Sequence, residues 1–149
     1  MNLKEHLFLE CKAFISIRRL VIENVISEIE ISLQSETKSS AGDKHETGRA
    51  MLQLEREKTG NQLVEIEKYE EILSKIHTSA TRSIVSLGSI VFTTEANYFI
   101  TIGVGEITVD NQKFYAVSAT APIGKVLIGK RVNDEVVFRD RKFKIINLL

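Results

Sequence analysis

The sequence predicts an α+β protein with an N-terminal antiparallel two-helix coiled-coil hairpin and a C-terminal antiparallel β-sheet module that carries one short helix. Three observations predict this fold. Residues 1–78 contain no proline and are rich in Glu, Lys, Gln, Leu and Ile, which favour helices. Seven of the ten aromatic residues follow residue 78, within β-branched runs interrupted by Gly, Asn and Asp. A polar turn separates two long helix-forming segments of similar length. We therefore place the module boundary between residues 78 and 79.

The composition limits the classes of function. The chain has 149 residues, of which 43% are hydrophobic and 27% charged, as in folded soluble proteins. Its net charge of zero argues against a nucleic-acid binder or a membrane reader that depends on bulk positive charge. No apolar run is long enough to span a membrane, so no membrane partner is expected. Cys11 has no second cysteine to pair with, and the N-terminus lacks signal-peptide features, so we expect a cytoplasmic protein.

Apolar residues recur at helical spacing in both halves of the first module. The first segment has a stripe at spacings of three, four and seven, formed by Leu3, Leu7, Phe14, Ile17, Val21, Val25, Ile29 and Leu33. The second segment repeats the pattern more weakly through Leu52, Leu63, Ile66, Tyr69, Leu73 and Ile76. Two antiparallel helices joined by a turn at residues 37–46 would bury both stripes against each other.

The second module reads as short strands around one helix. We expect the strands at residues 83–85, 89–94, 97–104, 113–118, 135–138 and 142–148. Asp110 and Asn111 favour a hairpin turn. Pro122 suits the first turn of a helix and Gly129 a helix end, which predicts a short helix between them.

The polar turn contains the main candidate site. Asp43 and Glu46 lie three residues apart at the start of the second helix, so their carboxylates can face the same way. Carboxylate oxygens are ligands that Mg²⁺ prefers. The same spacing fits a capping box, which would satisfy backbone amides of the helix start, and both roles can coexist. Lys44 and His45 could contact RNA or phosphate, or could simply be solvated.

Residues 117–136 resemble the C-terminal signature of the bacterial Gre transcript-cleavage factors. In that family a Ser-Pro pair opens a helix, Leu-x-Gly-Lys closes it, and a Gly-Asp turn leads into the next strand. Here the corresponding residues are Ala121-Pro122, Leu127-Ile128-Gly129-Lys130 and Asn133-Asp134. The family tip sequence Gly-Asp-x-x-Glu also has a counterpart, Gly42-Asp43-Lys44-His45-Glu46. The resemblance covers nearly the whole chain, and it implies a coiled-coil hairpin followed by an FKBP-like domain.

The chain departs from the family pattern at both ends of this resemblance. The family tip usually continues Glu-Asn-Ala-Glu-Tyr, whereas this chain has Glu46-Thr47-Gly48-Arg49-Ala50 and so lacks an acid and an aromatic residue. Ala121 replaces the serine before the proline, where Thr120 or Ser118 could supply a capping hydroxyl. Asn133 replaces a glycine and tolerates the left-handed conformation that such turns require.

The resemblance implies a partner and a mechanism. Gre factors insert the coiled coil through the secondary channel of bacterial RNA polymerase, and the polymerase then cleaves the displaced 3′ end of a backtracked transcript. Asp43 and Glu46 would help to hold a catalytic Mg²⁺ and its water jointly with the polymerase, and the isolated protein would hold none. The chain would thus be an accessory factor, monomeric and not itself an enzyme, with indirect contact to the RNA 3′ end. The C-terminal domain would dock at the rim of the channel through Ile123, Lys125, Lys130 and Arg131.

Three alternatives remain open at the level of the sequence. The chain could be a Gre-like channel binder that does not stimulate cleavage but inhibits or modulates the polymerase. An FKBP-like fold would also suit a peptide-binding or prolyl isomerase module. Finally, the long helices could form a coiled-coil scaffold, which would dimerise in solution.

Overall fold

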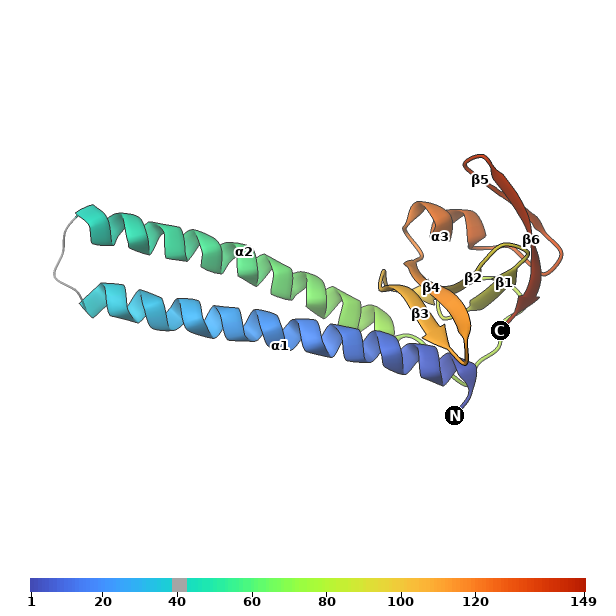
Figure 1. Cartoon of the computed structure of the whole chain (residues 1–149), viewed down its shortest axis with the longest axis horizontal. Coiled ribbons are helices and arrows are strands. Elements are labelled where there is room, and N and C mark those ends of the chain that lie inside the picture. The colour runs from blue at the N-terminus through green and yellow to red at the C-terminus, as the bar shows by residue number, and fades with distance from the viewer. Residues whose placement is uncertain (39–42) are drawn as a thin grey trace. The chain divides into compact units, whose positions relative to one another are not determined.

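The computed structural model describes the backbone of residues 1–38 and 43–149 and the side chains of residues 1–35 and 46–149 (Figure 1). The elements in chain order are α1 (Leu3–Lys38), α2 (Asp43–Ser74), β1 (Ile90–Thr93), β2 (Asn97–Thr101), β3 (Gly105–Val109), β4 (Gln112–Ser118), α3 (Pro122–Leu127), β5 (Glu135–Phe138) and β6 (Arg141–Leu148). The helical hairpin, the mostly antiparallel sheet and the short helix of the predicted fold class are confirmed. Most of the turn predicted at 37–46 lies outside the fully described residues. No described helix has the length and apolar character needed to cross a membrane.

The chain divides into two compact units. One unit comprises Met1–Phe14 together with Glu71–Leu149, and the other comprises Ile15–Glu70. The first unit therefore contains the start of α1, the end of α2 and the whole sheet, while the second contains most of the hairpin. The module boundary predicted between residues 78 and 79 stays a prediction about domain organisation.

Ion pairs across the hairpin unit define the direction of its helices. Arg19 Nη1 lies 2.6 Å from Glu70 Oε1, and Arg56 Nε lies 3.4 Å from Glu30 Oε1. The partner on α2 moves toward the start of that helix as the position on α1 advances, so the helices are antiparallel. Arg19 is also paired with Glu23 one turn along α1, at 2.8 Å. Charged groups at such positions favour one register over its alternatives.

The seam between the helices follows a seven-residue repeat. On α1, Ile15, Ile22 and Ile29 are seven residues apart and buried. On α2, Thr59 and Ile66 are buried at the same spacing. A repeat of seven keeps one face of a helix against its partner, as in coiled coils.

The apolar stripe predicted on α1 is partly wrong. Phe14, Ile17 and Val21 are exposed, at 36%, 65% and 57% of their surface. The reason is that α1 carries apolar residues around much of its circumference, so more than one series fits helical spacing. The buried series passes through Ile15, Ile22 and Ile29, of which Ile29 also belongs to the predicted stripe.

The sheet has six strands in the order β3-β4-β2-β1-β6-β5. Its pairs are antiparallel except for β2 and β4, which run parallel with Tyr98 opposite Tyr115 and Thr101 opposite Ser118. The sheet predicted as antiparallel is therefore mostly antiparallel, with this one parallel pair. Strand β3 forms a hairpin with β4, and the returning β4 then lies beside β2 in the same direction.

Two strand predictions also need correction. The run expected at 97–104 ends at Thr101, and a separate strand, β3, follows from Gly105, where φ is +91°. The segment 83–85 is not a strand, although Val85 is buried and exchanges backbone hydrogen bonds of 2.9 Å with Gly129 and Lys130. The sequence of β3, with alternate burial only at Ile107 and Val109, gave too weak an apolar signal for prediction.

The turn residues of this unit adopt the predicted conformations. Asp110 and Asn111 have φ of 49° and 63° and connect β3 to β4, and Asn133 has φ of 76°. Asparagine and aspartate tolerate this left-handed region better than most residues. The hairpin turn and the left-handed Asn133 are therefore confirmed.

One buried cluster of the sheet unit is contributed by the sheet, α3 and the segment before β1. Its members are Val85, Val91, Tyr98, Ile100, Leu127, Val136, Phe143, Ile145 and Leu148. Leu127 is fully buried and fixes α3 on the sheet. Burying a side chain of this size contributes about 2 kcal/mol.

Helix α3 begins without a side-chain cap. Its N-cap is Ala121, and the hydroxyls of Ser118 and Thr120 lie 2.9 Å apart, bonded to each other instead of to the helix. The predicted capping role for Ser118 or Thr120 is wrong. Pro122 opens the helix as predicted, because a proline at this position removes an amide that would have no partner.

Gly124 allows α3 to lie directly on the chain that leaves β4. A Cβ atom at this position would be 2.0 Å from the carbonyl oxygen of Ser118, which no real contact permits. The position therefore requires glycine because of space, and the close approach sets where α3 lies.

The N-terminal turns of α1 belong to the same unit as the sheet. Lys4 is 6% exposed, and its Nζ donates a 2.6 Å hydrogen bond to the carbonyl oxygen of Ala80. Cys11 is fully buried beside Thr101. Burial is the main cause that raises the pKa of the Cys11 thiol from 9.0 to about 12, so the thiol is protonated at neutral pH.

We expect Gly124→Ala to lower the free energy of unfolding by about 3 kcal/mol, because the added methyl group forces α3 away from Ser118. Chemical denaturation measures the change. Gly103→Ala is the matched control, since a Cβ there meets nothing within 4 Å. Equal stability of the two variants would contradict the close approach of α3.

We expect the Cys11 thiol of the folded protein to react with a disulfide reagent far more slowly than a free thiol at pH about 8. Denaturant should release one reactive thiol per chain. The folded thiol holds its proton more tightly than the unfolded thiol, so the stabilisation linked to Cys11 is complete below pH 9.0 and is lost as the pH rises toward 12. Rapid labelling without denaturant would show that Cys11 is accessible.

Candidate functional site

The predicted catalytic and metal-binding residues lie at the start of α2. This helix begins at Asp43, so the backbones of Asp43 and Glu46 are both in its first turn. The Glu46 side chain is exposed. The side chains of Asp43, Lys44 and His45 lie outside the described residues, so their predicted roles stay predictions. A carboxylate in the first turn of a helix is also favoured by the partial positive charge of the exposed amides.

The residues after Glu46 connect the start of α2 to α1. Arg49 Nη1 donates a 3.3 Å hydrogen bond to the carbonyl oxygen of Leu33. By the resemblance described above, Arg49 corresponds to the last glutamate of the Gre tip sequence, which follows the counterparts of Asp43 and Glu46. In this chain that position therefore carries a cation that joins the two helices near the turn.

The donor set at the turn suits a shared metal ion. Mg²⁺ is commonly bound by one or two carboxylates and completed by waters and phosphate oxygens. Asp43 and Glu46 are two acidic positions three residues apart in the first turn of one helix, and Glu46 is open to solvent. Elsewhere in the described part of the chain, no group of three or more His, Cys, Asp or Glu side chains could hold a metal ion.

The predicted partner-binding residues lie on and directly after α3. Lys125 is exposed in the last turn of the helix, and Arg131 is exposed with its backbone amide bonded to Asp134 Oδ2 at 2.7 Å. Lys130 is half-buried, and its backbone carbonyl oxygen accepts a 2.9 Å hydrogen bond from the amide of Val85. Three cations are thus contributed by a segment of seven positions, 125–131. Their contact with a partner stays a prediction.

Ile123, the fourth predicted partner-binding residue, lines a surface cleft that the sequence did not reveal. The cleft has a volume of about 440 Å³, and its lining residues are Glu95, Ala96, Tyr98, Tyr115, Val117, Ile123, Phe138 and Arg141. The aromatic members appear as strand core in the sequence. The signal available in the sequence was a tyrosine on each of two predicted strands. The hydroxyl of a buried tyrosine usually needs a hydrogen-bond partner or contact with water, so such residues often lie at an opening in the core.

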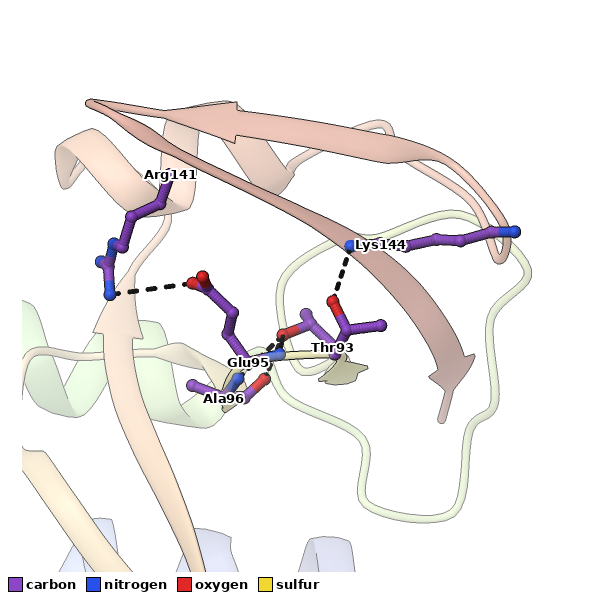
Figure 2. Close-up of polar contacts among 6 residues, drawn as sticks. Thr93, Glu95, Ala96, Arg141 and Lys144 are labelled. Atoms are coloured by element: carbon purple, nitrogen blue, oxygen red, sulfur yellow. Dashed lines mark hydrogen bonds and ion pairs between the residues drawn. The ribbon is translucent and has the colours of Figure 1, made fainter.

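A polar network holds one rim of this cleft (Figure 2). Thr93 Oγ1 accepts the amides of Glu95 and Ala96 at 3.1 and 3.0 Å and donates to the Ala96 carbonyl oxygen at 2.6 Å. This fixes the turn between β1 and β2. Glu95 Oε2 then lies 3.8 Å from Arg141 Nη1 at the start of β6. The backbone amide of Lys144 is held by Thr94, which ties β6 to the same turn.

No protein-family model matches the chain, and no curated protein sequence matches it. Among solved structures, the crystal structure of GreA factor homolog 1 (Gfh1) protein of Thermus thermophilus is 17% identical, with 92% of this chain and 93% of that chain covered and a TM-score of 0.36. A second structure, of the transcription factor Gfh1, is 19% identical, with 91% of each chain covered and a TM-score of 0.35. At these identities and scores, the likeness carries no argument about the function of this chain.

Proposed function

We propose that the chain is a Gre-like elongation factor that binds bacterial RNA polymerase. The proposed factor is a cytoplasmic monomer. In this proposal the hairpin enters the secondary channel, and the sheet unit docks at the rim. The observation that carries the proposal is the start of α2 at Asp43, which puts two carboxylate positions in the first turn beside the hairpin bend. The order of the units and the Gre-like sequence of 117–136, folded as the end of β4, α3 and the start of β5, support it.

The hairpin would act as a rigid carrier for these carboxylates. The ion pairs of Arg19 with Glu70 and of Arg56 with Glu30 fix the register of the helices, and Arg49 joins them near the bend. A carboxylate on such a frame loses little conformational freedom when it reaches its working position.

Asp43 and Glu46 would contribute oxygen ligands, and the polymerase would supply the remaining ligands. A Mg²⁺ ion held there would supply Lewis-acid chemistry at the RNA phosphate, and Asp43 and Glu46 would hold and orient it. The part played by this chain is to place and orient the carboxylates. The reaction itself belongs to the polymerase, so the chain is an accessory factor.

One observation favours a second candidate function, a channel binder that modulates the polymerase without stimulating cleavage. Arg49 stands in place of an acid and is bonded to the Leu33 carbonyl oxygen. The tip thus has one carboxylate fewer and a cation near Glu46. Both candidates share the binding step and differ only at the tip.

The docking surface of the sheet unit would comprise Ile123, Lys125, Lys130 and Arg131. The three cations favour an acidic partner surface, and Ile123 adds an apolar contact. Long-range attraction between such surfaces raises the rate of association more than the final affinity.

We expect the full chain to co-purify with bacterial RNA polymerase. The double variant Lys130→Gln, Arg131→Gln should bind about tenfold more weakly, because two ion pairs of up to about 1 kcal/mol each are lost. Titration with labelled protein measures the affinity. Lys113→Gln, which removes an exposed cation of β4, is the control. Absence of binding by the unaltered chain would overturn the proposal.

We expect Asp43→Asn and Glu46→Gln each to reduce cleavage of the transcript in stalled, backtracked complexes by about tenfold to a hundredfold, because each removes a charged metal ligand. Gel analysis of the shortened RNA measures the rate at saturating factor. Binding should be unchanged, since neither residue belongs to the docking surface. If the unaltered chain binds but stimulates no cleavage, the channel-binder candidate replaces the first.

A further inference from the structure

We propose that the cleft beside α3 binds an acidic peptide segment of a partner protein, with one bulky aromatic side chain of the segment packed against Tyr98, Tyr115 and Phe138. This proposal is independent of polymerase binding, because it rests only on the residues that line the cleft. Its volume of about 440 Å³ is within the range of sites that receive a side chain or a small ligand.

The walls of the cleft are formed in advance. Tyr98 and Tyr115 are directly opposite each other on β2 and β4, with ring centroids 6.1 Å apart. Tyr98 also stacks on Phe143 of the core, at 6.4 Å. Ile123 projects from α3, which Gly124 holds against the end of β4. Because these side chains lie on helices and strands, they lose little conformational freedom when a ligand binds.

The hydroxyl of Tyr98 has no hydrogen-bond partner among the described residues. The Tyr98 side chain is only 6% exposed, and no other described residue makes a hydrogen bond to its hydroxyl. The buried side-chain polar atoms without partners among the described residues are Ser86 Oγ and Thr101 Oγ1, so the Tyr98 hydroxyl retains access to solvent. Tyr98 is a lining residue of the cleft, so a ligand in the cleft lies beside this side chain. Burial raises the pKa of Tyr98, which keeps the hydroxyl protonated and able to donate to a peptide carbonyl.

The charges at the rim favour an acidic ligand. Arg141 is held by Glu95 only at 3.8 Å, with their side chains 55% and 36% exposed, and an open pair of this kind contributes little stability. Its guanidinium can therefore turn to a ligand carboxylate and bind it through two hydrogen bonds. Arg139 does not line the cleft but lies next to a residue that does, with its Cζ 5.0 Å from the centre of the Phe138 ring.

A peptide fits these walls better than an enclosed metabolite. Tyr115 is 37% exposed, and Arg141 and Glu95 are open to solvent. The cleft would therefore cover one side chain of a bound peptide and leave the neighbouring peptide residues at the rim. Sites for small molecules usually bury most of the ligand. An aromatic side chain is favoured because it can pack edge-to-face with the three rings. Glutamates beside it would then reach Arg141 and Arg139.

The test uses the full chain, labelled with nitrogen-15, and a short blocked peptide that has one phenylalanine between glutamates. Amide shifts should concentrate on the residues that line the cleft. Arg141→Gln should weaken binding about tenfold, because a charge-assisted pair is lost, and Tyr98→Phe several-fold, because one donor is lost. Ile123→Trp should block the cleft. Lys113→Gln is the matched control, and a dispersed amide spectrum verifies that each variant is folded.

Two further peptides decide the chemistry. Replacing the phenylalanine by alanine, or the glutamates by lysines, should each weaken binding at least about tenfold. Equal binding of the alanine peptide, preference for the lysine peptide, or shifts confined to residues outside the cleft would each overturn the proposal. Absence of any shift at millimolar peptide would overturn it as well, whatever the outcome with RNA polymerase.

Discussion

The parallel pairing of β2 with β4 is the constraint on which the sheet unit depends. It sets Tyr98 opposite Tyr115 and ends with Thr101 opposite Ser118. Ser118 then supplies the carbonyl oxygen on which Gly124 rests, so the position of α3 follows from the same register. A shift by one residue would turn every side chain of β4 to the other face of the sheet. The core, the arrangement of residues 123–131 and the cleft would all be lost together.

In the hairpin, polar groups set the register between the two helices. The isoleucines of α1 stabilise the hairpin by removing apolar surface from water. A repeat of similar apolar side chains nevertheless tolerates several registers of one helix against the other. Arg19 and Arg56 each reach a carboxylate across the seam, and Arg49 reaches a backbone carbonyl. Three arginines therefore specify how the helices align, while the isoleucines make the alignment stable.

Local patterns in the sequence were sufficient for much of this structure. The change in composition near residue 78 predicted the kinds of element on each side, and Pro122 predicted the start of α3 because proline acts within its own turn. Which face of α1 is buried depends on α2, and α1 has apolar residues on several faces, so Ile17 and Val21 were placed wrongly. The cleft depends on strand order, which brings β2 beside β4, and no spacing along the chain encodes that neighbour. The acids at positions 43 and 46 were selected from their spacing, and the role proposed for them stays a prediction.

The hydrogen bond from Lys4 to Ala80 and the contact of Cys11 with Thr101 have a topological consequence. The chain starts one unit, leaves it to build the hairpin, and returns to finish it, so the hairpin is an insertion within a discontinuous domain. During synthesis, Cys11 is made long before Thr101 exists to cover it. The first turns of α1 can therefore complete this packing only after Thr101 has left the ribosome.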